Sequence, residues 1–428
     1  MTNSALLALT GRLFDGETLW PHATVLMQQG RVLEVGVKLP LPDGTEVLDA
    51  GPGGIILPGL VDLHVHARPR YARWFPEAGV TTVRDAGNSL DMLTELRALA
   101  AAGEGPRVFG AGTILDGPNS IFRHFGEGVL GEVGDSTAGA WIVRNPREAQ
   151  AAVDALAAAG VDTVKLYEQL PPDAYRAAVW RAHEHGLPVM TDLGMRLTRG
   201  LSGAQVDARE ALKLGVQTLE HVSGLALAFR RLGFDPATQF PDEGTLAAFA
   251  RAIVEAGTAL VPTLSVYEGV RHDQRADLSA LPQGLRGGET SDSLCAQWDA
   301  IHTATAGQRA APGWDARLAV ALTRRVLDLG GQVGAGTDTP AGVDNLPGGG
   351  LHAELAHLVT HAHLRPIEAL RAATATAGRL LANGGTPLVG VLRAGAHADA
   401  LIVDGDPTRE IIATRRIRTL VRAGRVWA

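Results

Sequence analysis

The strongest constraint on the fold is a regular alternation of apolar runs and helical patterns through the middle of the chain. Eight runs read as buried strands: Leu60–His64, Val80–Arg84, Arg107–Ala111, Thr163–Tyr167, Pro188–Thr191, Val216–Glu220, Ala259–Thr263 and Gln332–Thr337. Many of the helical patterns between them end at a glycine, a common helix-stop signal. This alternation predicts an α/β protein with a (β/α)₈ TIM barrel over residues 58–385. An open doubly wound sheet is disfavoured because no G-x-G-x-x-G follows the first strand.

The two ends of the chain have a different pattern from the middle. Residues 1–57 and 386–428 read as short β segments separated by turn signals such as Asp15-Gly16 and Ala423-Gly424. Two β-rich ends that flank an alternating middle predict one small composite β-sandwich domain built from both segments.

The composition limits the classes of partner and compartment. The chain has 428 residues, a net charge of -7 and no conspicuous Lys/Arg cluster, which argues against nucleic-acid and anionic-membrane partners. Its one cysteine, Cys295, excludes an intrachain disulfide and a zinc–thiolate cluster. A secretory leader and a membrane-length apolar run are both missing from the pattern, so we expect a cytoplasmic protein. We expect a small-molecule substrate, and the sequence is compatible with a homo-oligomer.

A histidine pair closes the first predicted strand. His64 and His66 stand two residues apart at the end of the run that begins at Leu57. Residues i and i+2 of a strand point to the same side, so the two imidazoles aim at one point. That spacing is typical of a metal site.

Other predicted strands also end in groups that bind metal or move protons. Strand 4 carries Lys165, strand 5 ends at Asp192, strand 6 at His221 and strand 8 at Asp338. Barrel enzymes place their catalytic residues at the C-terminal ends of several strands. These four residues and the histidine pair are therefore predicted to converge on one rim.

Several motifs, spread over essentially the whole chain, together resemble the motifs of one family. They are Pro58–His66, the Lys165 strand, Leu219-Glu220-His221, Gly336-Thr337-Asp338, Leu351–Leu355 and Ala394–Ala400. With these motifs the chain resembles the amidohydrolase superfamily, in particular its imidazolonepropionase-like and Xaa-Pro-dipeptidase-like metal-dependent hydrolases.

The resemblance implies a binuclear metal centre. His64, His66 and Asp338 would hold one ion, and Lys165, carboxylated by CO₂, would bridge to a second ion held by His221 and a strand-5 residue. An ammonium group cannot ligate a metal, whereas a lysine carbamate is anionic and offers two oxygens. Histidine-rich ligation favours zinc, with two ions expected and one ion as the alternative. Asp338 would take the proton from the metal-activated water and pass it to the leaving nitrogen.

The strand-5 position departs from the family pattern. Most relatives have a histidine there, whereas this chain has Asp192. Asp192 is a legitimate oxygen ligand for zinc. Three interpretations stay open: Asp192 ligates the second ion, the second ion binds weakly, or Asp192 hydrogen-bonds a ligand instead.

Two long connections are predicted to cover the substrate. Residues 112–145 follow strand 3 and residues 264–312 follow strand 7, and both leave the C-terminal end of the predicted barrel. Arg123 and His124 lie in the first connection and are candidates for contacting a substrate carboxylate or carbonyl. Tyr167 and Tyr267 follow strands 4 and 7 and are further candidates for substrate binding.

These residues predict a metal-dependent hydrolase that uses a metal-bound hydroxide to cleave a C–N amide bond. The expected substrate is a small peptide-like molecule, an N-acyl amino acid or a cyclic amide. A lactone or ester hydrolase with the same site is the first alternative, because the attacking group is the same. A non-catalytic homologue with a degraded second metal site, caused by Asp192, is the second alternative.

Overall fold

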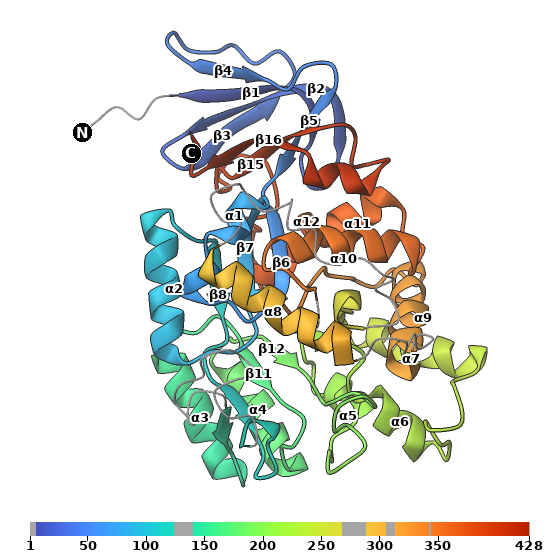
Figure 1. Ribbon diagram of the computed structural model, residues 1–428. Coiled ribbons are helices and arrows are strands. Elements are labelled where there is room, and N and C mark those ends of the chain that lie inside the picture. The colour runs from blue at the N-terminus through green and yellow to red at the C-terminus, as the bar shows by residue number, and fades with distance from the viewer. Residues whose placement is uncertain (1–5, 124–139, 268–287, 305–312, 342–343, 428) are drawn as a thin grey trace.

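Both ends of the chain enter one sheet. The computed structural model describes residues 6–123, 140–267, 288–304, 313–341 and 344–427. Within them, an eight-stranded sheet has the order β17-β16-β15-β5-β1-β2-β3, with β4 paired to β1 (Figure 1). Its strands are β1 (Leu7–Phe14), β2 (Leu19–Gln28), β3 (Arg31–Gly36), β4 (Glu46–Asp49), β5 (Gly54–Pro58), β15 (Ala400–Asp404), β16 (Ile417–Arg422) and β17 (Arg425–Val426).

The join between the two ends is made by β5 and β15. They pair antiparallel along their whole length, with Ile56 opposite Ile402. Residues of both ends, including Leu9, Val25 and Val421, share one buried apolar cluster. Burial of these side chains on a common face stabilises the pairing of segments that are far apart in the sequence.

Parallel strands run through the middle of the chain. One sheet has the order β6-β7-β8, and a second has the order β10-β9-β11-β12-β13-β14. Their bounds are β6 (Leu60–Val65), β7 (Val80–Asp85), β8 (Arg107–Gly110), β9 (Ile114–Asp116), β10 (Ala140–Ile142), β11 (Val164–Leu166), β12 (Val189–Thr191), β13 (Thr218–Glu220) and β14 (Ala259–Val261). Seven of these strands overlap the first seven strands that the alternation predicts.

A glycine separates β8, which agrees with the predicted third strand, from a further strand that was not predicted. β8 pairs with β7, whereas β9 pairs with β11, and Gly112 lies between them with a φ of 63°. A Cβ at Gly112 would lie 2.7 Å from the side chain of Leu90, so the turn also needs the missing side chain. The connection predicted as a covering loop therefore begins with a strand, β9, and also contains β10.

The predicted eighth strand, residues 332–337, is not a regular strand. Isolated bridges join Val333 to Leu260 and Thr339 to Val65, and the amide of Leu63 donates to the carbonyl of Ala335 at 2.9 Å. The segment approaches its neighbours closely because it is rich in glycine. A Cβ on Gly334 would lie 2.4 Å from the Leu63 side chain. This segment thus has hydrogen bonds to both β6 and β14 without forming a continuous ladder.

Helices follow most of the parallel strands (Figure 1). They are α1 (Trp74–Glu77), α2 (Leu90–Ala102), α3 (Pro146–Ala158), α4 (Pro172–Glu184), α5 (Ala208–Lys213), α6 (Leu225–Arg231), α7 (Glu243–Glu255), α8 (Glu289–Ala304), α9 (Trp314–Asp328), α10 (Gly349–Thr360), α11 (Pro366–Ala372) and α12 (Ala375–Leu381). Side chains of Ser89, Asn145 and Asp242 cap the amides at the start of α2, α3 and α7. Among the described residues, no helix is long and apolar enough to cross a membrane.

The strand that carries the histidine pair is attached directly to the terminal sheet. Only Gly59 separates β5 from β6, and its amide donates to the carbonyl of Asp399 at 2.9 Å. A Cβ on Gly59 would lie 2.1 Å from Thr81 Oγ1, so a larger residue would push β7 away. The position of β6 is therefore determined by both sheets.

Candidate metal centre

The six side chains predicted from the strand ends lie together. His64 is in β6 and His66 follows it, Lys165 is in β11, and Asp192 and His221 directly follow β12 and β13. Asp338 follows the irregular segment 332–337. Five of these residues lie at or near the C-terminal ends of parallel strands, which is where sites form in such folds, and the irregular segment brings Asp338 to the same place.

His64, His66 and Asp338 form the tightest part of the site. Oδ1 of Asp338 lies 3.4 Å from Nε2 of His64 and 3.2 Å from Nε2 of His66. One ligand atom from each of the three residues lies within 4.8 Å of the others. We call this group the β6 half of the site. Its donors are two imidazole nitrogens and a carboxylate oxygen, which suit a divalent metal.

Lys165, Asp192 and His221 form a second group beside the first, which we call the β11–β13 half. Nε2 of His221 lies 3.4 Å from Oδ2 of Asp192, and Nζ of Lys165 lies 4.0 Å from the same oxygen. Nε2 of His221 is also 3.9 Å from Oδ2 of Asp338, so the two halves adjoin. Lys165 is 1% exposed, which makes it one of the largest fully buried side chains.

Hydrogen bonds determine which nitrogen of each histidine faces the site. Nδ1 of His66 donates to the carbonyl of Gly87 at 3.0 Å, and Nδ1 of His64 donates to Oε2 of Glu220 at 2.6 Å. Nδ1 of His221 donates to the hydroxyl of Thr263, which itself donates to the carbonyl of Pro262. In each neutral imidazole the proton is therefore on Nδ1, and Nε2 is a bare acceptor.

This arrangement fits a cation. When the imidazoles are neutral, the three Nε2 atoms face the carboxylates of Asp338 and Asp192, so hydrogen-bond acceptors lie opposite one another with no proton between them. A divalent metal ion between them would satisfy both sides, and the charge of each carboxylate would offset part of its own. The donor set therefore fits a metal at the β6 half by its chemistry as well as by its spacing.

The electrostatics of the two aspartates favour their charged forms. Burial raises the pKa of Asp338, but His64 and His66, which in their protonated forms attract this carboxylate and donate to it from Nε2, outweigh burial and hold the pKa well below its usual value. Burial likewise raises the pKa of Asp192, but His221 and Lys165 outweigh it and lower that pKa. Both groups are therefore carboxylates at neutral pH.

Two of the predicted ligands have unusual backbone conformations. His221 has a φ of 58° and Asp338 a φ of 59°, in the left-handed region that non-glycine residues rarely adopt. Thr263, the hydrogen-bond partner of His221, has a φ of 46°. Such strain persists where surrounding contacts hold it, often at functional sites. Here it turns side chains at the strand ends toward the site.

The four residues predicted to bind substrate differ in where they lie. The side chain of Arg123 and the whole of His124 lie outside the described residues. The ring of Tyr167 lies 6.0 Å from Nζ of Lys165, at the edge of the site. Tyr267 is buried, and its hydroxyl contacts Sδ of Met195 at 3.3 Å. Their roles in binding stay predictions.

Sequence reasoning did not identify the residues that support the ligands. Glu220 holds the ring of His64, and Asp62 accepts from the amides of His64 and Thr337 at 3.2 and 3.1 Å. Asp62 is fully buried, and burial raises its pKa to about 7. A signal was available in both cases, because an acidic residue inside an apolar strand needs a buried partner.

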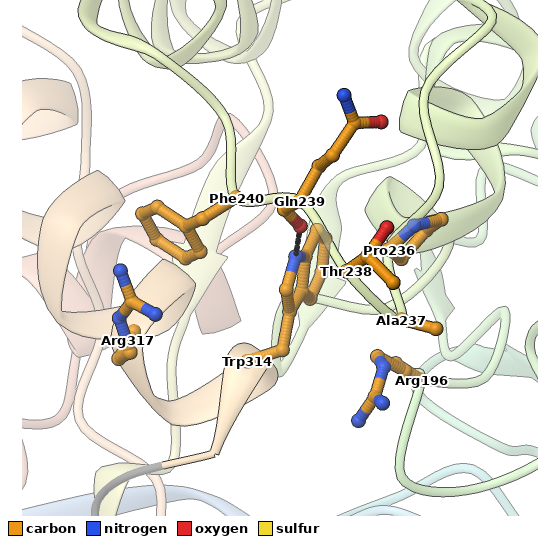
Figure 2. Close-up of a pocket in the computed structure, with 8 residues that line it drawn as sticks. All are labelled: Arg196, Pro236, Ala237, Thr238, Gln239, Phe240, Trp314 and Arg317. Atoms are coloured by element: carbon orange, nitrogen blue, oxygen red, sulfur yellow. Dashed lines mark hydrogen bonds between the residues drawn. The ribbon is translucent and has the colours of Figure 1, made fainter.

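The described surface also carries an open cleft away from the site. It has a volume of about 250 Å³ and is lined by the 236–240 loop, Trp314, Arg196 and Arg317 (Figure 2). Nε1 of Trp314 donates to the carbonyl of Gln239 at 2.9 Å across it. The six candidate site residues are not among the described residues that line this cleft.

The protein has an α/β fold with parallel strands, and this fold brings two histidines and an aspartate together. It therefore belongs to the class of α/β proteins that carry a metal-compatible site at the ends of parallel strands. The chain belongs to the amidohydrolase family, whose model matches residues 55–426. This family is generally metal-dependent, and its members have a TIM-barrel-like fold with α and β content.

The chain is similar to individual proteins either in its whole fold, at low sequence identity, or in sequence over a short segment. The chain is similar in structure to a Xaa-Pro dipeptidase with bound methionine, with 18% identity, a TM-score of 0.67, and coverage of 99% of this chain and 100% of that one. It is similar to ochratoxinase of Aspergillus niger, with 19% identity, a TM-score of 0.67 and coverage of 99% and 96%. A dihydroorotase of Geobacter sp. (strain M21) is 45% identical over 64 residues, which are 15% of each chain. That curated relative is therefore matched over only a small part of its length.

Proposed function

We propose that the protein hydrolyses a C–N amide bond in a small peptide-like, N-acyl amino acid or cyclic amide substrate, with the help of divalent metal. The observation that supports this most is the convergence of three bare Nε2 atoms on the carboxylates of Asp338 and Asp192. Family membership adds independent support, because it points to hydrolysis of C–N bonds.

His64, His66 and Asp338 would hold the first ion, and Lys165, Asp192 and His221 would hold a second one. When bound, the metal would polarise the substrate carbonyl and lower the pKa of a water molecule. We propose zinc, because the donors are imidazole nitrogens and carboxylate oxygens. Asp338 would accept the proton of the attacking water, a role supported by its lowered pKa and by the position of its Oδ1 3.2–3.4 Å from Nε2 of His64 and His66. It would then return this proton to the leaving nitrogen.

Lys165 would act in this site as a carbamate. An ammonium group has no lone pair for a metal, yet Lys165 is buried beside Asp192 and near the histidines. Loss of one proton from the ammonium to solvent, followed by reaction of the neutral amine with CO₂ and loss of a second proton, would convert a buried cation into an anion with two oxygens. That anion would complete the β11–β13 half and bridge the two ions.

The scaffold that we propose for this site is a closed barrel over residues 58–385 with a separate domain from residues 1–57 and 386–428. Closure is supported by the amide of Asp162, which donates to the carbonyl of Gly110, and by the bonds of segment 332–339 to β6 and β14. The composite domain is supported by the pairing of β5 with β15.

The test is a substrate panel with metal-replete protein. Dipeptides, N-acyl amino acids, cyclic amides and lactones are incubated with the wild type and with the His64→Ala variant. We expect turnover of at least one amide class that His64→Ala and chelator treatment abolish. Turnover of lactones alone would replace the amide proposal with an esterase, and full activity in the stripped protein would overturn the metal-dependent reaction.

A further inference from the structure

A buried arginine lies behind the histidine pair. Arg84, in β7, is 1% exposed, and its strand supplies none of the six candidate ligands. Its guanidinium donates to three acceptors: the carbonyl of Leu63 at 2.7 Å, Oγ1 of Thr218 at 3.0 Å and Oε1 of Glu220 at 2.7 Å. One side chain therefore links β7 to β6 and to β13.

Glu220 connects this arginine to a ligand. Its Oε1 accepts from Arg84 and from the hydroxyl of Thr218, and its Oε2 accepts from Nδ1 of His64. Glu220 is completely buried, so water does not replace any of these donors. Both carboxylate oxygens are thus committed, and the ring of His64 has one orientation that keeps its bond.

We infer that Arg84 and Glu220 form a positioning pair that holds His64 with Nε2 toward the metal, an inference that rests on the proposed function. Arg84 acts on His64 twice, because it binds the carbonyl of the preceding residue, Leu63, and the carboxylate that holds the ring. The planar guanidinium suits this task, since it presents several donors in a rigid fork.

The same contacts could serve stability alone, so the experiment must separate the two roles. A histidine ligand whose other nitrogen is held by a carboxylate gains orientation and basicity, and loss of that partner typically weakens metal binding by about 10- to 100-fold. A purely structural ion pair would change the melting temperature without changing the affinity of the folded protein for metal.

The variants are Glu220→Gln, Arg84→Met, Arg84→Lys and the double variant Arg84→Met/Glu220→Gln. Arg97→Met is the matched control, because Arg97 forms a partly buried ion pair with Asp162 at 2.7 Å, outside this network. The readouts are the Zn²⁺ dissociation constant by chelator competition, the visible spectrum of the Co²⁺-substituted protein, and the melting temperature of the metal-free protein.

We expect Glu220→Gln and Arg84→Met to bind Zn²⁺ about 10- to 100-fold more weakly, with an altered Co²⁺ spectrum. Arg84→Lys should recover part of the affinity, and the double variant should be less impaired than the two single effects combined, because the pair acts as one unit. Arg97→Met should bind as the wild type does.

Wild-type affinity and an unchanged Co²⁺ spectrum in Glu220→Gln and the folded arginine variants would overturn the inference, whatever happens to the melting temperature. If Arg84→Met does not fold, Arg84→Lys and Glu220→Gln decide the question. A wild-type protein that binds no metal would instead overturn the proposed function, and this inference with it, so the two failures are distinguishable.

Discussion

The two halves of the site differ in how completely the protein has assembled them. In the β6 half, one carboxylate oxygen of Asp338 lies 3.2–3.4 Å from Nε2 of both His64 and His66. In the β11–β13 half, Lys165 and Asp192 approach only to 4.0 Å, and one of the three groups is an amine. Under the proposed function, the first half would need only the ion, whereas the second would also need the carbamate on Lys165.

The supporting contacts differ in the same way. His64 and His66 are held by Glu220 and by the carbonyl of Gly87, and Asp62 holds the backbone of the strand. His221 is held by Thr263. The β6 half is therefore held by the buried carboxylates of Glu220 and Asp62, whereas the β11–β13 half has a hydroxyl partner for His221 and, in the proposed function, relies on a carbamate at Lys165. Substitutions that separate the halves can break or sharpen this comparison.

Loss of a ligand in the β6 half should have the largest effect. His64→Ala removes one of the three residues of the β6 half, and metal assistance lowers the barrier of such reactions by several kcal/mol. We expect kcat/KM to fall by at least about 10³-fold, with loss of bound metal measured by elemental analysis. His361→Ala is the matched control, because His361 and His363 repeat the same spacing at the end of α10. Equal losses in the two variants would contradict a special role for the β6 half.

Lys165→Met should remove the β11–β13 half alone. We expect the bound metal to fall from two ions per chain to one, and kcat/KM to fall by about 10²-fold, because the bridge between the ions is lost. Native mass spectrometry in bicarbonate should show the mass of one CO₂ on the wild type and none on the variant. A single ion in both proteins, with equal turnover, would show that the second half binds no metal.

Substitutions of Asp192 test whether this carboxylate holds the second ion. Asp192→Asn removes a negative charge 3.4 Å from Nε2 of His221 and should weaken the second ion by about tenfold, or 1.4 kcal/mol. Asp192→His should restore binding, because it supplies a neutral nitrogen ligand. Stepwise zinc titration of both variants provides the measurement. Unchanged affinity in Asp192→Asn would mean that Asp192 contacts a ligand other than the metal.

Substitution of His352 should change how stability depends on pH without affecting either half of the site. His352 is buried and forms hydrogen bonds with the carbonyl of Ala78 and the hydroxyl of Thr414. Burial, and to a smaller extent repulsion from Arg415, lowers its pKa to about 4. The unfolded state, with a pKa near 6.5, therefore takes up a proton first as the pH falls. Stability should decline between pH 6.5 and pH 4 by roughly 3 kcal/mol, with no contribution from this group above that window.

The measurement is chemical denaturation of the wild type and of His352→Gln across this range. Subtracting the two curves cancels buried carboxyl groups such as Glu354, whose pKa burial raises to about 7 and which act in the opposite direction. A difference curve that does not change with pH would refute the assignment. Zinc affinity at pH 7.5 should be equal in the two proteins, in contrast to the variants of either half.

The candidate ligands were predictable because each ends a short apolar run. Lys165, His221 and Asp338 are separated by many residues, yet a parallel sheet brings the ends of its strands to one edge. The additional strand β9 and the irregular segment 332–337 were less predictable. Gly112 lies between β8 and β9, and the glycines of segment 332–337 allow close approach without a regular ladder. Such effects depend on neighbours such as Leu63 and Leu90, whose positions a local pattern does not contain.

The sequence by itself determined the alternation of strands and helices and the types of side chain that stand at the strand ends. Only the tertiary structure decided which nitrogen of each histidine faces the site and which residues enforce that choice. The reason is physical. A side chain's type and phase along a strand are local properties, but the partners of Glu220, on β6 and β7, lie more than a hundred residues away from it in the chain. Their approach exists only after the strands have packed.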